Sequence, residues 1–372
     1  MPRFLVACDK FKGSLTAPEA CAAVARGIRK VIPNAEIDPC PIADGGEGFV
    51  DAIITAVEGK KVECQTLDAL GRPITAYYGL AQTQDGISAV MEMAEAAGLW
   101  RLKDNERDIL HADTRGVGIL MHHAVAEYGA TRLVLGIGGS ATNDGGVGMA
   151  HALGVRFYDA TGNELDPNPA ALLRLAHIDR SKQISLPPMT VACDVSNPLL
   201  GPRGATRIFG PQKGADAKNT PILEAFLGRL IHATEGFDDA DAPGAGAAGG
   251  LGFGLLHFLN ADLRPGFDIV SRTVGLHARI ACADIVVTGE GSLDTQSLAG
   301  KGPAGVALQG LLAAKPVVAV VGRCDNEVRM SGLFHHIAAV LERGYTIPQC
   351  MANGARYLEE ESAQVPWSDW FA

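Results

Sequence analysis

The segment FLVACDKFKGSLTAPEACAAVARGIRKV, residues 4–31, decides the fold class of this chain. Its first part, Phe4 to Cys8, is a continuous apolar run, which is typical of a strand buried on both faces of a sheet. After a polar loop, Thr16 is placed to cap a helix, with Glu19 at the third helical position of a capping box. The segment therefore predicts a strand, a loop and a helix that runs to about Val31.

The same order of elements returns elsewhere in the chain. Strands alternating with helices favour a parallel sheet that helices cover on both faces. The further strands predicted for this sheet are residues 37–40, 283–288, 317–321 and 336–341, and the helices are residues 49–57 and 303–314. The tail after Gly354 is predicted to be a terminal helix with a frayed end.

The middle of the chain has strands of a different sheet, predicted at residues 67–78, 86–93, 133–136 and 189–193. We interpret this middle part as a second α/β domain that interrupts the first. The predicted fold is therefore α/β with two domains. A doubly wound parallel-sheet domain, residues 1–66 plus 284–372, is interrupted by an inserted α/β domain, residues 67–283.

Composition excludes several classes of protein. The net charge is −10 and no cluster of Lys and Arg stands out, which argues against a nucleic-acid binder. No apolar run approaches the ~18 residues of a membrane span. Eight scattered cysteines without a C-x-x-C pair predict reduced thiols rather than a zinc site. The charged N-terminus is unlike a signal peptide, so we expect a soluble cytoplasmic enzyme.

Glycine-rich and polar loops follow the predicted strands, where open α/β sheets bind ligands. In the first, Asp9 to Ser14, Lys10 and Lys12 could hold phosphates or an anionic substrate. In the second, PIADGGEG at residues 41–48, Asp44 and Glu47 could hold Mg²⁺ or substrate hydroxyls. Carboxylates at a helix N-terminus can also be simple caps, and the residues leave both interpretations open.

The third loop, GIGGSATNDGGVG at residues 136–148, contains G-x-G-x-x-A, a loose dinucleotide fingerprint. No acidic residue ends a second strand about 20 residues later, which weakens an NAD(P) interpretation. What remains is a run of small residues whose backbone amides could cradle phosphates. The candidate ligand contacts are Gly138, Gly139, Ser140, Thr142 and Asn143.

Three later loops add further candidates. Asp194 follows an apolar strand directly, a position that suits a general base or a metal ligand, and Asn197 precedes a proline in a turn. Lys213 is expected on a flexible loop. The stretch Gly244 to Gly249 spells G-x-G-x-x-G without a preceding strand, so a flexible lid or a helix start at close backbone approach is the better interpretation. The acids of the last loop are Glu290 and Asp294.

Several well-defined catalytic signatures do not occur in the sequence. There is no G-x-x-x-x-G-K-[ST], which excludes a P-loop NTPase, and no H-R-D or D-F-G, which excludes a protein kinase. The motifs H-E-x-x-H and G-x-S-x-G are also missing, which argues against a zinc protease and an α/β-hydrolase.

Taken in order, the loops resemble the bacterial glycerate kinase family. The stretches that carry the resemblance are DKFKGSLTA, PIADGGEG, GIGGSATNDGGVGM, ACDVSNPLLGPRGA, FGPQKGA, GAAGGLGFG and TGEGSLDTQSLAGKGP, and they extend from about residue 2 to residue 344. The resemblance implies a phosphotransferase with an alcohol acceptor, which phosphorylates D-glycerate with ATP and Mg²⁺ in organic-acid catabolism. It favours 2-phosphoglycerate over 3-phosphoglycerate, implies an active site in the cleft between two α/β domains, and leaves open whether the chain forms a homo-oligomer.

Under this resemblance each loop receives a role in phosphoryl transfer, which depends on positioning and charge neutralisation. Asp194 is the expected base or orienter of the glycerate hydroxyl, and Lys12 would neutralise the substrate carboxylate or the γ-phosphate. The full expectation is catalytic Asp194, Lys12 and Asp44; substrate-binding Asp9, Lys10, Ser14, Glu47 and Asn197; nucleotide-binding Gly138, Gly139, Ser140, Thr142, Asn143, Lys213, Glu290 and Asp294; and metal-binding Asp44 and Asp194.

Two other functions compete with this interpretation. An NAD(P)-dependent hydroxy-acid oxidoreductase would use the G-x-G-x-x-A stretch, but its acidic partner and a positioned catalytic histidine are missing. A non-catalytic binder of nucleotides or acids would avoid so many loop carboxylates. A melting temperature raised by ATP and not by NAD would exclude the oxidoreductase. Release of ADP in the presence of glycerate would exclude the non-catalytic binder.

Overall fold

The computed structural model describes residues 1–43, 46, 48–295, 297 and 302–371. By their internal contacts the residues group into two compact units. Unit 1 comprises Met1–Asp44, Asp51–Glu58 and Phe267–Ala372, and unit 2 comprises Gly45–Val50 and Gly59–Gly266. Each unit is described by itself.

Unit 1 contains a parallel sheet whose central strands are buried and mostly apolar. Its strand order is β15 (His336–Ala339), β13 (Val317–Val321), β11 (Ile285–Gly289), β1 (Arg3–Cys8) and β2 (Glu36–Pro39). Every pairing is parallel, and β1 lies between β2 and β11. A second, two-stranded parallel sheet pairs β12 (Ser292–Leu293) with β14 (Arg323–Cys324) just beyond the ends of β11 and β13.

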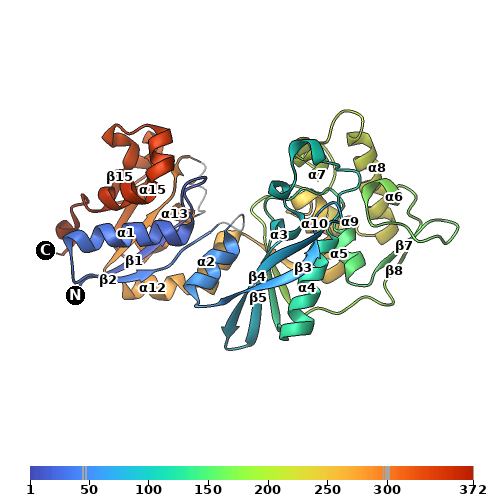
Figure 1. The fold of residues 1–372 in the computed structure, drawn as a ribbon, viewed down its shortest axis with the longest axis horizontal. Coiled ribbons are helices and arrows are strands. Elements are labelled where there is room, and N and C mark those ends of the chain that lie inside the picture. The colour runs from blue at the N-terminus through green and yellow to red at the C-terminus, as the bar shows by residue number, and fades with distance from the viewer. Residues whose placement is uncertain (44–45, 47, 296, 298–301, 372) are drawn as a thin grey trace. The chain divides into compact units, whose positions relative to one another are not determined.

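Helices cover both faces of this sheet, as predicted. Helices α1 (Ala17–Val31) and α15 (Ile347–Ser362) contact each other and bury Phe4, Val6 and Cys8 on one face (Figure 1). Helix α13 (Gly302–Leu312) contacts the sheet from the opposite face. The remaining helices assigned mainly to this unit are α2 (Phe49–Ala56), α11 (Gly266–Thr273), α12 (Leu276–Cys282) and α14 (Asn326–Arg329).

The predicted start of α1 is confirmed in detail. The Thr16 hydroxyl accepts a hydrogen bond from the Glu19 backbone N–H, and the Glu19 carboxylate accepts one from the Thr16 backbone N–H. This capping box satisfies two backbone donors that the first turn would otherwise leave without a helical partner.

Unit 2 contains a mixed sheet that is parallel in one half and antiparallel in the other. The strand order is β10 (Asp262–Arg264), β9 (Met189–Ala192), β6 (Arg132–Gly136), β5 (Gly86–Glu92), β4 (Pro73–Thr83) and β3 (Lys60–Leu67). The β3–β4 and β4–β5 pairs are antiparallel, and the others are parallel. The α/β class with mainly parallel sheets is therefore confirmed.

Helices of 4 to 15 residues and one small antiparallel sheet complete unit 2. Apolar side chains of β3 to β6 and α4 form one core, and the helices with β7 and β8 enclose a second. The helices are α3 (Ala94–Ala97), α4 (Arg115–Tyr128), α5 (Val147–Ala152), α6 (Pro169–Leu172), α7 (Ala205–Phe209), α8 (Thr220–Thr234), α9 (Phe237–Asp241) and α10 (Ala247–Leu259), and the small sheet pairs β7 (Arg156–Tyr158) with β8 (His177–Asp179).

Two local predictions are wrong. The strand predicted at residues 67–78 begins too early: residues 68–72 form the turn of a hairpin, in which Gly71 has φ +75° and Asp68 accepts from the Arg72 backbone N–H, and residues 73–78 are the start of β4. The predicted fraying is not seen at Trp367, which is 1% exposed and whose ring lies 5.4 Å from that of Phe4. The tail is held by Trp367, whose buried partner Phe4 lies at the other end of the sequence and could not be identified from local patterns.

The domain boundaries at residues 66/67 and 283/284 stay a prediction. Along the sequence, the two compact units are divided instead at residues 58/59 and 266/267, apart from the short segment Gly45–Val50 of unit 2. Strand β3 pairs with β4 along its whole length, and so belongs with the sheet of unit 2. Residues from Phe267 to the start of β11 group with unit 1, where Arg279 donates to Asp38 and to the Ala56 carbonyl.

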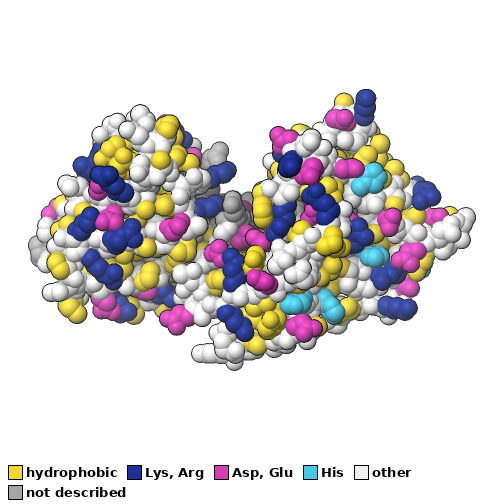
Figure 2. Space-filling view, viewed as in Figure 1, with side chains coloured by type: hydrophobic (Ala, Val, Ile, Leu, Met, Phe, Trp, Pro, Cys, Tyr) yellow, Lys and Arg dark blue, Asp and Glu magenta, His cyan; other side chains and the backbone are white. Residues whose placement is uncertain are grey.

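Surface charge is mixed in sign. On the face shown in Figure 2, Lys and Arg side chains alternate with Asp and Glu, and hydrophobic side chains are scattered between them. Among the residues that the structure describes, no helix is both long and apolar enough to cross a membrane.

Candidate active site

The first loop, which follows β1, presents its charged side chains at the carboxyl end of the sheet in unit 1. Asp9 is 7% exposed, and its backbone N–H donates to the Gly289 carbonyl at the end of β11. The Asp9 carboxylate accepts from the Lys10 backbone N–H at 2.6 Å. Lys10 is half-buried and Lys12 is exposed. The sheet therefore fixes Asp9 rigidly and leaves the two ammonium groups near solvent.

Ser14 and Gly13 hold this loop against helix α15. The Ser14 hydroxyl donates to the Met351 carbonyl at 3.2 Å and lies 3.5 Å from that of Cys350. Gly13 has φ +76°, and a Cβ there would lie 2.7 Å from the Met351 methyl group. The left-handed backbone angle favours glycine at this position, and the Met351 methyl group occupies the space beside it. The substrate-binding role of Ser14 stays a prediction, and its observed partners are carbonyls of α15.

The loop after β11 brings the two predicted acids of unit 1 together through a serine. The Ser297 hydroxyl donates to the Glu290 carboxylate at 2.6 Å, and the Ser297 backbone N–H donates to Asp294 at 3.3 Å. Both acids are half-buried. Glu290 also lines the same cavity as the first loop, whereas Asp294 does not.

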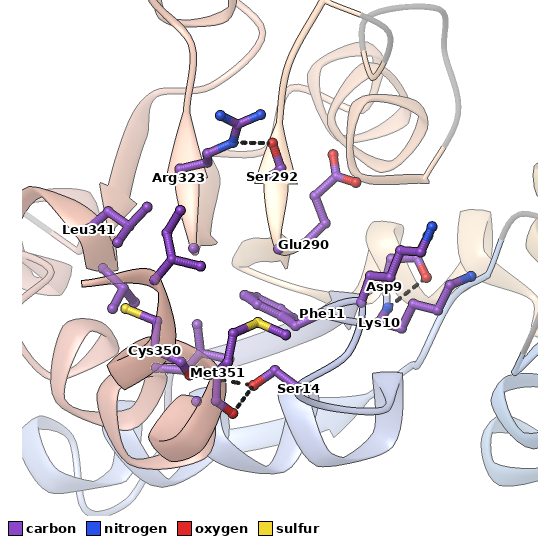
Figure 3. Close-up of a pocket in the computed structure, with 17 residues that line it drawn as sticks. Asp9, Lys10, Phe11, Ser14, Glu290, Ser292, Arg323, Leu341, Cys350 and Met351 are labelled. Carbon is purple, nitrogen blue, oxygen red and sulfur yellow. Dashed lines mark hydrogen bonds between the residues drawn. The ribbon is translucent and has the colours of Figure 1, made fainter. Parts of the chain in front are cut away.

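A cavity of about 410 Å³ lies where β1, β11, β13 and β15 end. In Figure 3 Asp9 and Lys10 lie on the opposite side of Phe11 from Leu341 and Cys350. The Arg323 guanidinium donates to the Ser292 hydroxyl at 2.6 Å on its upper edge. The polar residues are Asp9, Lys10, Lys12, Ser14, Glu290, Ser292 and Arg323, and the apolar ones include Phe11, Val340, Leu341, Ile347, Cys350, Met351 and Leu358.

In unit 2, most of the loop predicted to contact nucleotide is inside the protein. Gly138 is half-buried and Gly139 exposed, but Ser140 is 7% exposed and Thr142 and Asn143 are 0% exposed. The Asn143 amide donates to the Thr206 hydroxyl at 3.0 Å. Among the described residues, the Thr142 hydroxyl oxygen and the Asn143 amide oxygen have no hydrogen-bond partner.

Lys213 lies inside this cluster, which contradicts the expected flexible loop. The residue is 1% exposed at the end of a 3₁₀ turn, Pro211–Lys213. Its ammonium donates to the Ser140 hydroxyl at 2.6 Å and to the Thr142 carbonyl at 2.8 Å. Burial lowers the pKa of Lys213 to about 7, and the Asp144 carboxylate acts against this shift. The glycines next to Lys213 in the sequence favoured a flexible loop, and no local pattern indicated that its side chain is buried.

Asp144, the acid of the same loop, serves the structure. Its carboxylate accepts from the Thr114 hydroxyl at 2.7 Å and from the backbone N–H groups of Gly146 and Gly148. Burial raises the pKa of Asp144, and these hydrogen bonds oppose the rise. The carboxylate therefore ties the glycine loop to the start of α4.

Backbone-on-backbone packing explains the glycines in unit 2. Gly249 has φ +69°, and a Cβ there would lie only 1.9 Å from the Thr142 carbonyl oxygen. Its own carbonyl accepts from the Gly145 backbone N–H at 3.0 Å. The stretch predicted as a flexible lid or a close helix start, residues 244–249, is buried and leads into α10. The lid alternative is wrong, and the close approach is the observed arrangement.

Asp194 and Asn197 follow β9 in unit 2. Asp194 is half-buried, and its carboxylate accepts from the backbone N–H of Gly266, the first residue of α11, at 3.0 Å. The Asn197 side chain donates to the Arg203 carbonyl at 2.7 Å and so closes the following turn. The predicted roles of both residues stay predictions.

Two of the predicted metal and substrate ligands cannot be compared with the structure. Asp44 and Glu47 lie outside the described residues. Within the described residues, no group of three or more His, Cys, Asp or Glu side chains could hold a metal ion.

Sequence reasoning missed Arg323, although its place after a Val-rich strand was a usable signal. It also missed the wall that α15 supplies, since Ile347 and Met351 are apolar at helical spacing but carry no motif.

Comparison with known proteins identifies relatives over nearly the whole chain. A model of the glycerate kinase family matches residues 4–367. A glycerate kinase from Bacillus subtilis is 41% identical and covers 98% of this chain and 96% of its own, and a glycerate 2-kinase from Escherichia coli is 42% identical over 88% of this chain and 86% of its own. A crystal structure named as glycerate kinase 2 from Salmonella typhimurium LT2 has a TM-score of 0.86 and 37% identity, over 99% of this chain and 98% of its own.

Proposed function

The chain belongs to the glycerate kinase family, and from this premise we propose that it transfers the γ-phosphoryl group of ATP to the 2-hydroxyl of D-glycerate with the help of Mg²⁺. Family membership makes the chain a phosphotransferase that acts on an alcohol group and takes its phosphoryl group from ATP. The E. coli relative, at 42% identity, is named a glycerate 2-kinase, which supports the 2-hydroxyl as the acceptor.

The cavity of unit 1 is the observation that carries the proposal. It lies beyond the carboxyl ends of parallel strands, the position at which open α/β sheets bind nucleotides. Lys10, Lys12 and Arg323 contribute three cations to its lining. Phosphoryl transfer needs such charges, because negative charge is spread over the oxygens of the transferred group.

The residues around this cavity fit a magnesium ion carried by the nucleotide. Such ions are usually held through one or two carboxylates plus phosphate oxygens, and not by an all-protein cage. Asp9 and Glu290 offer carboxylates at the ends of two adjacent strands. When bound, the ion would neutralise charge on the β- and γ-phosphates. We therefore propose Asp9 and Glu290 as ligands of this ion, and the metal-binding roles of Asp44 and Asp194 stay predictions.

Asp194 is the proposed base or orienter for the glycerate hydroxyl. It stands directly after β9, and the Gly266 backbone N–H holds one of its oxygens. A backbone donor fixes the direction of the carboxylate, whose oxygens can accept the hydroxyl proton.

The proposed regiochemistry is tested by the product. Purified protein, D-glycerate, ATP and Mg²⁺ are expected to give one phosphate monoester. Its phosphorus NMR signal should couple to a single proton, because carbon 2 of glycerate carries one hydrogen and carbon 3 carries two. Coupling to two protons would assign the 3-hydroxyl, and no ester at all would overturn the proposed activity.

The role of Asp194 is tested by Asp194→Asn, which keeps the size of the side chain. We expect kcat to fall by at least about 10²-fold, the usual contribution of a general base. The control is Asp262→Asn, which removes an exposed acid paired with Arg264 at 2.5 Å and should leave kcat unchanged. A loss below about tenfold for Asp194→Asn would remove the base assignment.

We further propose that the protein acts in the cytoplasm on glycerate released by organic-acid breakdown. None of the eight cysteines is in a disulfide, and four of them are buried, as expected for a reducing compartment. Fractionation of cells followed by the ADP-release assay tests this location.

A further inference from the structure

We propose that the nucleoside of ATP binds against helix α15 in the cavity of unit 1, with the triphosphate directed to Lys10 and Lys12. The inference rests on the proposed function in taking ATP as the donor. It assigns a separate site for the base and sugar, and gives α15 the role of their wall. The predicted glycine loop of unit 2, residues 138–143, is then not the nucleoside site.

The shape of the cavity is the first argument. Its volume of about 410 Å³ is within the range of small-molecule sites, roughly 300–1,000 Å³. In Figure 3 the apolar Leu341, Cys350 and Met351 lie across Phe11 from Asp9 and Lys10, and Arg323 lies on the upper edge. A ligand that fits both sides has a flat, weakly polar head and an anionic tail, and a nucleoside triphosphate has that form.

The exposed apolar side chains of α15 are the second argument. Ile347 is 63% exposed and Met351 is 43% exposed, and the two lie one turn apart on the helix surface that lines the cavity. Leu358, further along the same helix, is 1% exposed and closes the cavity at depth. A purine base covering Ile347 and Met351 would remove apolar surface from water.

The attachment of α15 to the first loop is the third argument. The Ser14 hydroxyl donates to α15 carbonyls, and Gly13 leaves room for the Met351 methyl group. Gly354 allows the same contact from the helix, because a Cβ there would lie 2.3 Å from the Ser14 hydroxyl oxygen. The loop that carries Lys10 and Lys12 is thus fastened to the proposed nucleoside wall, which fixes the distance between the two ends of the ligand.

The buried glycine loop of unit 2 is the fourth argument. Thr142 and Asn143 are 0% exposed, and the Lys213 ammonium already donates to the Ser140 hydroxyl and the Thr142 carbonyl. A nucleoside could contact the buried Thr142 and Asn143 only if α10, which packs against them through Gly249, moved away. The open cavity of unit 1 needs no such rearrangement.

Alkylation of Cys350 tests the inference on the native protein. Cys350 lines the cavity and is partly exposed, whereas Cys282 is exposed and does not line it. We expect saturating Mg·ADP to slow alkylation of Cys350 by N-ethylmaleimide at least about fivefold, with Cys282 unchanged, as measured by peptide mass spectrometry. Inorganic tripolyphosphate should protect Cys350 much less, because it lacks the part that covers the thiol.

A matched pair of variants tests the wall itself. Met351→Ser should raise the Kd of ADP about fivefold and leave the inhibition constant of tripolyphosphate unchanged. The control Ala352→Ser changes an exposed neighbour that does not line the cavity, and should leave both constants unchanged. Because Met351 is partly exposed, the variant should fold normally, and its melting temperature verifies this.

Each outcome decides the inference. Unchanged alkylation of Cys350 with ADP, equal protection by tripolyphosphate, or protection by D-glycerate alone would overturn it. Protection by ADP in a protein that does not phosphorylate glycerate would leave the nucleoside site in place and remove the proposed function instead.

Discussion

Unit 1 and unit 2 both place polar, glycine-containing loops at the carboxyl ends of parallel strands, but the two loops end in opposite environments. After β1, Lys10 and Lys12 remain near solvent beside a cavity. After β6, Ser140, Thr142 and Asn143 are enclosed together with the Lys213 ammonium. The first loop can meet a ligand directly, whereas the second has already used several of its polar groups.

This difference shows that a glycine-rich loop after a strand does not by itself indicate a phosphate site. In unit 2 the glycines allow two backbone segments to approach each other, at Gly249 and the Thr142 carbonyl. In unit 1, Gly13 and Gly354 bring a loop and a helix together beside a space that stays open. The same residue type serves packing in one unit and access in the other.

The largest effect is expected from Gly249→Ala. The new methyl group would meet the Thr142 carbonyl at a backbone angle of φ +69°, so the variant should lose about 3 kcal/mol of stability or more. The control Gly162→Ala has φ +84° with no atom within 4 Å of the added Cβ, and should lose only about 1 kcal/mol. Melting curves by circular dichroism compare them, and equal losses would contradict the close packing.

The next effect concerns the pH dependence of stability through Lys213. Burial lowers the pKa of Lys213 from 10.5 to about 7, so between these values the unfolded chain binds more protons than the folded one. Stability therefore rises with pH across this window, by about 2 kcal/mol from pH 7 to 9. Lys213→Met should lack that rise, as urea midpoints at the two pH values would show.

Lys218→Met is the matched control, since Lys218 is exposed and lies five residues further along. It should keep the pH dependence of the unchanged protein. If Lys213→Met also keeps it, the ammonium is not sealed from water and the contrast between the two loops fails.

A smaller effect is expected from Lys12→Ala in unit 1. Removing an exposed ammonium from the cavity should lower kcat/KM for ATP about tenfold, equivalent to about 1.4 kcal/mol, and leave stability within about 0.5 kcal/mol. Arg29→Ala, an exposed cation on α1 away from the cavity, should change neither. Initial rates at varied ATP measure the difference. A melting temperature that falls while the rates hold would instead make Lys12 a structural residue.

The smallest effect is expected from Thr142→Val. The Thr142 hydroxyl is buried and has no partner among the described residues, so a methyl group in its place should leave stability unchanged or raise it by up to about 1 kcal/mol. Thr206→Val removes an oxygen that accepts from the Asn143 amide, and should cost about 1 kcal/mol. Loss of activity in Thr142→Val at unchanged stability would mean that this loop does contact a ligand.

Local signals carried most of what the sequence could predict. The strand at residues 4–8, the capping box of Thr16 and Glu19, and the alternation of strands with helices depend on neighbours within a few residues, and all are confirmed. The hairpin between β3 and β4 was missed because its turn was read as part of a strand, although Gly71 marks it.

Burial over long distances in the sequence could not be predicted in the same way. Lys213 was expected on a flexible loop because its neighbours are glycines, but its burial depends on hydrogen bonds to residues about seventy positions earlier. The wall formed by α15 was missed because no residue type distinguishes an apolar side chain that lines a cavity from one on an ordinary helix. Both depend on tertiary contacts that local patterns do not encode.

The position of β1 between β2 and β11 has a consequence for the synthesis of this protein. The Thr288 side chain of β11 donates to the Ala7 carbonyl of β1, across 281 residues of chain. At ribosomal speeds, β1 waits on the order of tens of seconds for that neighbour. During this time the apolar segment FLVAC keeps an unpaired edge, and residues 59–266 are completed shortly before β11 is made. A nascent chain arrested before β11 would therefore expose a strand prone to aggregation beside a finished unit 2.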